Sequence, residues 1–225
     1  MDNNEVVVYT EIKKSSGKTK LVETELKGKN NYYDNDNIVF YSTEQLKALL
    51  DGITNEFHKL GVHLMYETGA RVEEIRDLKF SDVEISGRIK VLTLKQRKAN
   101  KIYRYLKISD KLMALILNHR LQNKLNDNDF VLSKKTGSPA IVRKSISYIV
   151  KYNTEKILGK NYLDKAHPHA MRHTRAIHLL DSGMNIMLLK NFLGHSNISN
   201  TLIYLKYSNS DMFCAVDKAN SGILR

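Results

Sequence analysis

The stretch HPHAMRHTRAIH (residues 167–178) places basic side chains on successive turns of a predicted helix. His169 and Arg172 are three residues apart, so they are neighbours on one helix face, and His173 also lies near His169. Two histidines at this spacing suit a metal ion, but the glutamate of an HExxH site is missing and the chain has a single cysteine. An arginine between the histidines also repels a cation. We therefore expect no metal, and taken alone the segment is better explained as a structural helix with a hydrogen-bonded histidine and a surface arginine.

Two helix ends elsewhere in the chain carry further basic residues. Arg71 follows a glycine in TGAR (68–71), and His195 follows another in LGH (193–195). A helix-ending glycine holds the next side chain rigidly while leaving it exposed. Arginines, histidines and a following tyrosine are the groups that metal-free phosphoryl transfer requires. Guanidinium groups neutralise charge on the non-bridging oxygens, histidines move protons, and a tyrosine with a pKa of ~10 needs such neighbours to become a nucleophile.

Two tyrosines are candidates for that nucleophile. Tyr204 and Tyr207 both follow His195 within LGHSNISNTLIYLKY (193–207). On a continuous helix Tyr207 lies ~60° round and ~4.5 Å further along than Tyr204. Both can face one cleft, so helix geometry alone leaves the choice open.

The composition indicates a nucleic-acid partner. The 225 residues carry a net charge of +12 with a sequence pI near 9.6. Such a balance is typical of proteins that bind polyanions, although a generally lysine-rich surface is the alternative. One cysteine suits a reducing interior, and the chain shows neither an apolar run of membrane-spanning length nor a signal-peptide pattern at its start. We expect a cytoplasmic, nucleoid-associated protein without a membrane partner.

Hydrophobic periodicity and capping residues predict a mainly α fold with a small antiparallel three-stranded β-sheet (α+β). Residues 1–37 are expected to form an arm with a strand at 6–12, and the sheet is expected within 82–108. A hairpin-like connection is expected at 129–140. The expected helices are 42–51, 55–68, 71–79, 109–123, 141–157, 169–182, 185–192, 199–206 and 210–220.

TGARVEEI, HPHAMRHTRAIHLL and LGHSNISNTLIY, in this order, resemble the three signature boxes of the tyrosine recombinase (phage integrase) family. The resemblance covers about residues 38–215 and implies that family's catalytic-domain fold. Tyr204, nine positions after His195, matches the family's nucleophile, and Tyr207 becomes a packing or DNA-contact residue. By position the resemblance also implies catalytic roles for Arg71, His169, Arg172 and His195, with Glu74 and His173 in support.

The family places a further catalytic residue, a lysine that protonates the leaving 5′ oxygen, on a hairpin of the small sheet. The segment LTLKQRKANKIYRYLKIS (92–109) offers Lys95, Lys98 and Lys101. Lys98 occupies the position that matches the family's turn, with Lys95 as the alternative. Lys95, Lys101 and Arg175 are expected as DNA contacts.

The resemblance implies a site-specific recombinase that works through a 3′-phosphotyrosyl link without metal, ATP or other cofactor. It acts on double-stranded DNA with specific sites, as a dimer on each site and a tetramer in synapsis. Residues 1–37 are too few for the family's core-binding domain, so we expect that either the arm with a dimer partner suffices or a helper DNA-binding protein does the rest. Residues 210–220 are expected either to exchange between protomers or to pack on their own domain. A type IB topoisomerase-like enzyme and a non-catalytic DNA-binding accessory are the alternatives. The sequence does not distinguish integration, excision and inversion, although its composition suits a mobile element.

Overall fold

A computed structural model of the chain describes residues 12–15, 18–21, 38–86, 89–95 and 103–208. The chain divides into two compact units, Met1–Asn37 and Ile38–Arg225. In the first unit, β1 (Ile12–Ser15) and β2 (Lys18–Leu21) pair as an antiparallel hairpin. The strand expected at 6–12 lies outside the described residues except for Ile12.

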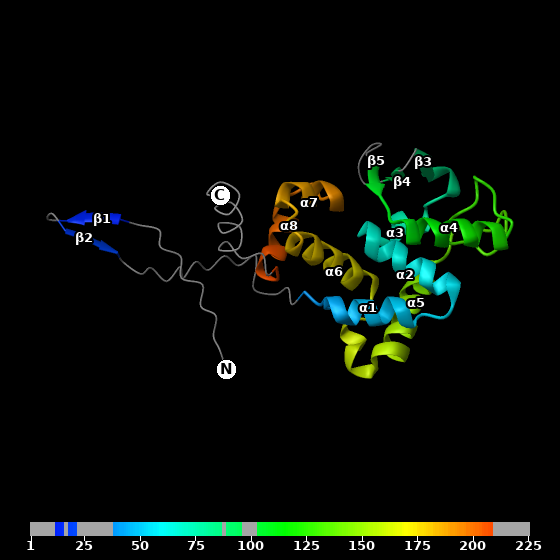
Figure 1. Cartoon of the computed structure of the whole chain (residues 1–225), viewed down its shortest axis with the longest axis horizontal. Helices are drawn as coiled ribbons and strands as arrows, with labels where there is room; N and C mark the ends of the chain where they lie inside the picture. Colours follow the sequence, from blue (N-terminus) through cyan, green and yellow to red (C-terminus); the bar gives the residue numbers. More distant parts are fainter. Residues whose placement is uncertain (1–11, 16–17, 22–37, 87–88, 96–102, 209–225) are drawn as a thin grey trace, which may run out of the picture. The chain divides into compact units, whose positions relative to one another are not determined.

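The second unit is helical with one small sheet, as expected (Figure 1). Strands β3 (Val83–Ser86), β4 (Ile89–Lys95) and β5 (Tyr103–Lys107) form an antiparallel sheet in the order β3-β4-β5. Its helices are α1 (Thr43–Gly52), α2 (Glu56–Thr68), α3 (Val72–Arg76), α4 (Asp110–Gln122), α5 (Arg143–Leu158), α6 (Pro168–Asp181), α7 (Ile186–Leu193) and α8 (Ser199–Leu202). The described residues also form the 3₁₀ helices η1 (Phe80–Asp82), η2 (Lys160–Lys165) and η3 (Ile203–Lys206).

Local capping chemistry sets the helix ends that the sequence predicted. Ser42 Oγ accepts the backbone N–H of Gln45 at 3.2 Å, and the Gln45 side chain accepts the N–H of Ser42 at 3.1 Å, a complete capping box. Gly69 and Gly194 end α2 and α7 with φ values of 54° and 67°. These left-handed conformations favour glycine because it has no Cβ to clash.

Two connections differ from expectation because distant segments pair. The helix expected at 71–79 stops at Arg76, since Val131 N donates to the carbonyl of Leu78 and Phe80 N donates to the carbonyl of Asp129. The hairpin-like connection expected at 129–140 is wrong: the structure describes these residues as a loop. Asp129 stabilises this loop by accepting the backbone N–H groups of Asn126 and Gly137 at 2.8 and 2.7 Å.

The C-terminal region also departs from a regular helix. The helix expected at 199–206 divides into α8 and the tighter 3₁₀ helix η3, which contains Tyr204. The loop expected before Pro168 contains η2. The helix expected at 210–220 lies outside the described residues.

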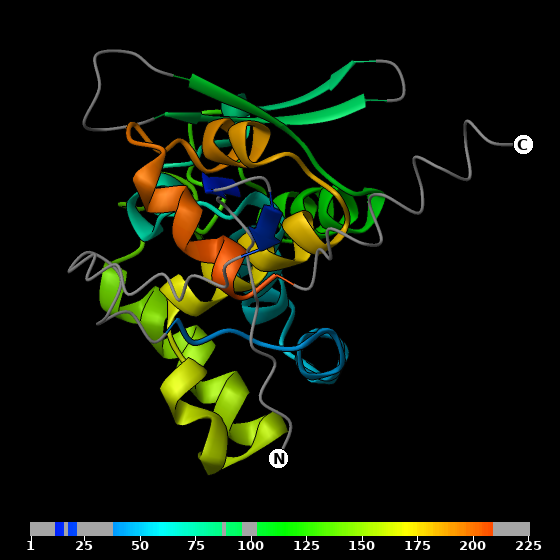
Figure 2. The same cartoon turned by 90° about the vertical axis from the view of Figure 1, so that its left-hand side faces the viewer.

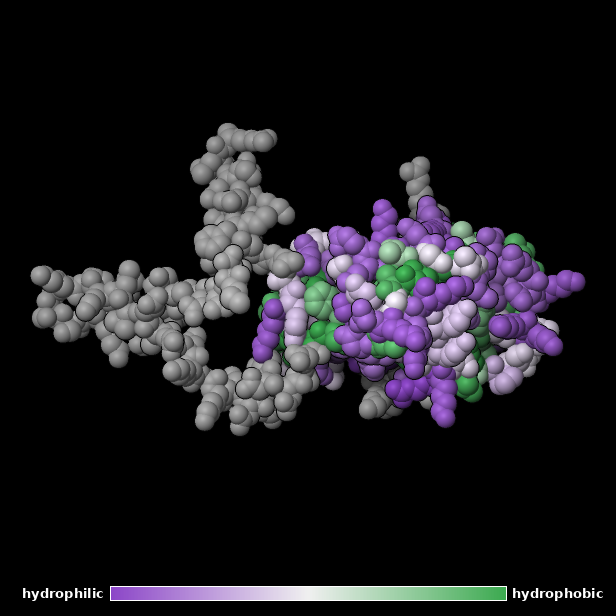
Figure 3. Space-filling model, turned by 90° about the horizontal axis from the view of Figure 1, so that it is seen from below, coloured by the Kyte–Doolittle hydropathy of each residue, from purple (hydrophilic) through white to green (hydrophobic). Residues whose placement is uncertain are grey.

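The core sits around α2, whose residues Leu60, Val62 and Leu64 are fully buried. This helix packs against α4, α5 and α6. Figures 1 and 2 show the sheet on one side of the helical body, with α5 and η2 on the opposite side. Polar residues dominate the face seen in Figure 3, with small apolar patches between them. No helix among the described residues is long and apolar enough to cross a membrane.

Candidate active site

The turn between α2 and α3 presents the first basic residue of the site. Thr68 Oγ1 donates to the carbonyl of Leu64 at 2.5 Å and accepts the N–H of Ala70 at 3.2 Å, which fixes the turn. Arg71 is the N-cap residue of α3, and the Glu74 carboxylate accepts its backbone N–H at 2.8 Å. The Arg71 side chain stays 39% exposed, whereas that of Glu74 is 3% exposed. A buried carboxylate therefore orients an accessible guanidinium.

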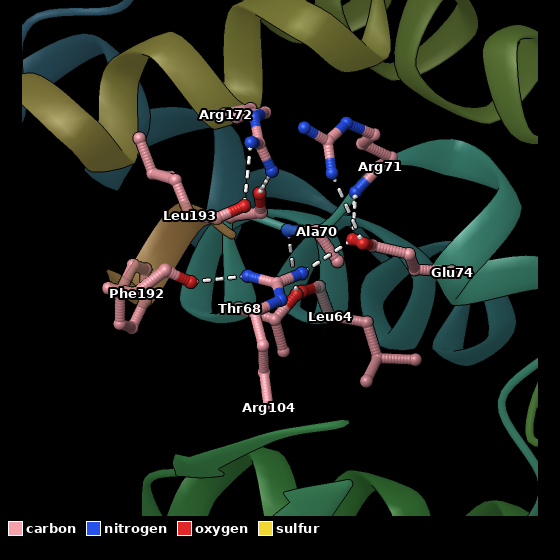
Figure 4. Close-up of polar contacts among 10 residues, drawn as sticks. Leu64, Thr68, Ala70, Arg71, Glu74, Arg104, Arg172, Phe192 and Leu193 are labelled. Carbon is pink, nitrogen blue, oxygen red and sulfur yellow. Dashed lines mark hydrogen bonds and ion pairs between the residues drawn. The ribbon is translucent and has the colours of Figure 1, made fainter. Parts of the chain in front are cut away.

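Arg172 joins this turn to the end of α7. Its guanidinium donates to the carbonyl oxygens of Gly69 at 2.5 Å and Leu193 at 2.8 Å, and the residue is only 4% exposed (Figure 4). Burial, followed by the nearby charge of Arg71, lowers the pKa of Arg172 to about 10, so it is cationic at neutral pH.

A third arginine, Arg104 of β5, completes the group and was not predicted. It donates to Glu74 Oε2 at 2.5 Å and to the carbonyl oxygen of Phe192, and its side chain is 5% exposed (Figure 4). A partial signal was present in the sequence. Strand alternation places Arg104 on the same face as buried Leu106, and a buried arginine needs a partner.

These contacts collect positive charge. The guanidinium groups of Arg71 and Arg104 contact the carboxylate of Glu74, and that of Arg172 binds the neighbouring carbonyls of Gly69 and Leu193 (Figure 4). Three cations against one carboxylate leave a surplus of two positive charges. Among the described residues, no group of histidine, cysteine, aspartate or glutamate side chains could hold a metal ion. The surplus of positive charge suits an anion, and Arg71 presents the most accessible of the three guanidinium groups.

Two histidines beside this group, His195 and His173, are held neutral. His195 Nδ1 is hydrogen-bonded to Thr201 Oγ1 at 2.8 Å, and burial, followed by the charge of Arg172, lowers its pKa to about 3. His173 lies one residue after Arg172 on α6. Burial, followed by the neighbouring His169, lowers the pKa of His173 to about 4. Thr201 is a supporting residue that the sequence reasoning missed.

Tyr204 lies beside His173 and is itself buried. Its hydroxyl is hydrogen-bonded to His173 Nδ1 at 3.0 Å, and the residue is 2% exposed. Burial raises the pKa of Tyr204, although the charges of Arg172 and Arg71 oppose that rise. In this arrangement Tyr204 is a neutral phenol covered by the protein.

Tyr207 has a different environment. Its hydroxyl accepts the backbone N–H of Ile38 at 3.3 Å, and its ring packs edge-on against Phe40 with 6.1 Å between centroids. The structure therefore brings Tyr204, and not Tyr207, next to the histidines of α6.

The remaining predicted residues are less closely joined to this group. His169 is exposed on the first turn of α6, with its ring 6.3 Å from that of His173. Arg175 packs on the rings of Tyr66 and Phe192, with its guanidinium carbon 5.1 and 5.8 Å from their centroids, and lines a separate cavity of about 480 Å³. Lys95 ends β4, and its side chain is not described. Lys98 and Lys101 lie outside the described residues.

The family model described as the phage integrase family matches residues 19–210. The chain belongs to the phage integrase family. This confirms the resemblance found in the three boxes. Two similar members are the tyrosine recombinase XerA of Pyrococcus furiosus and a tyrosine recombinase of Pseudothermotoga lettingae. The first is 30% identical over 181 residues, covering 79% of this chain and 60% of XerA. The second is 28% identical over 180 residues, covering 80% of this chain and 60% of the relative.

The chain thus spans about 60% of the length of these curated relatives. Among solved structures it is similar to the catalytic domain of bacteriophage HP1 integrase, with 28% identity and a TM-score of 0.55, covering 83% of this chain and 98% of that domain. The XerH site-specific recombinase, in a post-cleavage complex with a palindromic difH substrate, has the same fold. Its TM-score is 0.68 at 18% identity, covering 83% of this chain and 54% of XerH. These likenesses confirm the expected fold of the family.

Proposed function

We propose that this chain is the catalytic part of a site-specific DNA recombinase, with Tyr204 as its nucleophile. The observation that carries the proposal is the contact between the Tyr204 hydroxyl and neutral His173, one residue from Arg172 in the three-arginine group. Membership of the phage integrase family supports it, as do the names of the relatives and the surplus positive charge of the chain.

In the proposed reaction the scissile phosphate binds against Arg71 and Arg172, with His169 and His195 beside its non-bridging oxygens. The guanidinium groups stabilise the extra negative charge of the transition state without reorganising. The phenol oxygen forms a bond to phosphorus while the bond to the 5′ oxygen breaks. His173, already hydrogen-bonded to the hydroxyl, is the base that first meets the phenol proton. Lys98, with Lys95 as the alternative, protonates the leaving 5′ oxygen.

The product is a 3′-phosphotyrosyl link, and a 5′ hydroxyl from the partner duplex then attacks it in the reverse sense. Because the link retains the energy of the phosphodiester, rejoining needs no ATP. The buried hydroxyl adds one requirement to this scheme. Tyr204 is 2% exposed, so the η3 turn must shift before a phosphate can reach it.

The proposed partner is double-stranded DNA with specific sites, bound by a dimer on each site and a tetramer in synapsis. Residues 38–225 would then be the catalytic domain and residues 1–37 an arm, and an accessory DNA-binding protein is a further proposed partner. Lys95, Lys101 and Arg175 are proposed DNA contacts. Residues 210–220 are a proposed helix that exchanges between protomers or packs on its own domain. The proposed location is the nucleoid of the cytoplasm.

A suicide substrate tests the proposal. The native chain first selects genomic DNA fragments by retaining them on a filter. The shortest duplex that still binds is then synthesised with a nick beside the cleavage point. The nick lets the freed oligonucleotide diffuse away, so the covalent adduct accumulates and survives denaturation. We expect adducts with the native chain and with Tyr207→Phe, and none with Tyr204→Phe.

Tyr207→Phe is a matched control because it removes the same hydroxyl from the same turn. Adducts that persist in Tyr204→Phe contradict the assignment of the nucleophile. Binding without any adduct favours the accessory alternative. Adducts accompanied by relaxation of supercoiled plasmid, without strand exchange between duplexes, favour the topoisomerase-like alternative.

A further inference from the structure

Arg104 lies at the base of the hairpin that carries the candidate lysines. In the β4–β5 register it pairs with Leu94, and the next pair is Lys95 with Tyr103. Residues 96–102 connect those two strand ends. Whatever holds the Arg104 side chain therefore also holds the ends of the two strands that residues 96–102 connect.

The partners of Arg104 come from two elements far away in the sequence. One is Glu74 of α3, thirty residues away, and the other is the carbonyl of Phe192 at the end of α7, 88 residues away. Arg172 donates to the next carbonyl, that of Leu193. Two cations thus bind adjacent carbonyls at the C-terminal end of α7, where the helix dipole favours positive charge. That end leads directly to His195.

Arg104 also changes how far the negative charge of Glu74 offsets the positive charge of Arg71. The Glu74 carboxylate faces both guanidinium groups, at 2.5 Å from Arg104 and 3.4 Å from Arg71. Without Arg104, the full charge of this buried carboxylate would be directed at Arg71 and would cancel the charge meant for a phosphate. With Arg104 in place, Glu74 is neutralised from the buried side and Arg71 keeps its net charge for an anion.

Stability alone is a weak reason for this pair. The desolvation cost of a buried ion pair is commonly as large as its Coulomb gain, and well-packed apolar residues often do as well. A buried pair that fixes three elements in register has a more specific use, since catalytic groups must be held within about 0.5 Å of their working geometry.

From these contacts we propose that Arg104 is a positioning residue, which couples the lysine hairpin to the arginine group and to the His195 end of α7. The inference rests on the proposed function. It assigns to Arg104 no contact with DNA. Its effect passes through Lys98 or Lys95 on one side, and through Arg71 and His195 on the other.

The test compares Arg104→Lys with Arg104→Met on the nicked duplex, and Arg120→Lys is the control at a more exposed arginine. Arg120 makes the same two kinds of contact, with the carboxylate of Asp127 at 2.7 Å and the carbonyl of Leu125 at 3.2 Å, on α4. We expect both Arg104 variants to form adduct at least about tenfold more slowly than the native chain, with filter-binding affinity within about threefold. Arg120→Lys should match the native chain in both measurements.

A second substrate separates positioning of the hairpin from a general structural role. The same duplex is synthesised with sulfur in place of the bridging 5′ oxygen, because a thiolate leaves without being protonated. If Arg104 places the lysine, the defect of Arg104→Lys shrinks severalfold on the sulfur substrate. A loosened fold would slow both substrates equally. The melting temperature of each variant is measured as well, to check that it folds. If Arg104→Met does not fold, the comparison uses Arg104→Lys alone.

Three results would overturn the inference. Adduct formation by Arg104→Lys at the native rate removes the positioning role. An equal defect on oxygen and sulfur substrates removes the coupling to the hairpin. Absence of adduct with the native chain itself contradicts the proposed function, and this inference fails with it.

Discussion

Replacing His173 by asparagine should make the free energy of unfolding depend less steeply on pH below 6.5. In the folded chain the pKa of His173 is lowered from 6.5 to about 4, chiefly by burial. Between these two pH values the unfolded chain binds a proton that the folded chain does not. The free energy of unfolding therefore falls as the pH falls from 6.5 to 4, and it is highest above 6.5.

The structure sets the size of this effect. At about 1.36 kcal/mol for each pH unit, a pKa lowered from 6.5 to about 4 corresponds to about 3 kcal/mol of unfolding free energy, lost by pH 4. Near pH 5 this single group should contribute a slope of about 1 kcal/mol per pH unit. His195, whose pKa is lowered to about 3, acts in the same direction. Asparagine cannot titrate, yet its amide can still accept a hydrogen bond from the Tyr204 hydroxyl.

Urea unfolding from pH 4.5 to 7.5 measures the slope. Tyr204→Phe is the matched control, because it removes the hydrogen bond to His173 while keeping the burial that lowers the pKa. We expect the native slope in Tyr204→Phe and a slope smaller by about 1 kcal/mol per pH unit in His173→Asn. Equal slopes in His173→Asn and the native chain would refute the reasoning, since His173 would then titrate alike in both states.

Three further substitutions test the site by different measurements. Arg172→Lys keeps the charge but cannot hold both carbonyls and a phosphate. Adduct formation should therefore fall about 10²- to 10³-fold while DNA binding stays nearly intact. Equal losses of adduct formation and of DNA binding would instead mark Arg172 as a positioning contact. Thr201→Val removes the hydrogen-bond partner of His195 Nδ1. It should lower the unfolding free energy by about 1–3 kcal/mol in urea titrations, and it should slow adduct formation. Adduct formation at the native rate would show that this hydrogen bond does not orient the imidazole. Gly69→Ala, at φ 54° and with Leu193 only 3.2 Å from an added Cβ, should cost at least about 1–2 kcal/mol, and an unchanged melting temperature would contradict this strain.

The helical part of the fold and most of the candidate residues were readable from the sequence because their signals are local. Capping residues and helix-ending glycines act within one turn, as the capping box at Ser42 and the left-handed Gly69 illustrate. The spacing of Arg172 and His173 along one helix is equally local. Arg71 comes next to Arg172 only through the tertiary fold, and the order of the three boxes was what indicated it.

Features that depend on non-local pairing were not readable in the same way. Strand alternation indicates that Arg104 faces inward, but only the fold identifies Glu74 and Phe192 as its partners. The early end of α3 depends on backbone hydrogen bonds to residues near Asp129, and hydrophobic periodicity does not predict such bonds. The choice between Lys98 and Lys95 stays a prediction, because Lys98 lies outside the described residues and only the backbone of Lys95 is described.

The bond between Glu74 and Arg104 has a consequence for how the family evolves and for how its members can be engineered. Loss of Glu74 leaves the buried Arg104 without a carboxylate, and loss of Arg104 leaves Glu74 paired with Arg71 alone, so the two positions should be substituted together across related chains. A graft of the three boxes onto another scaffold would omit Arg104, because it lies on a strand outside all of them. Such a chimera would receive Glu74 with Arg71 but without its nearer counterion, Arg104. A transplantable unit must therefore include the strand.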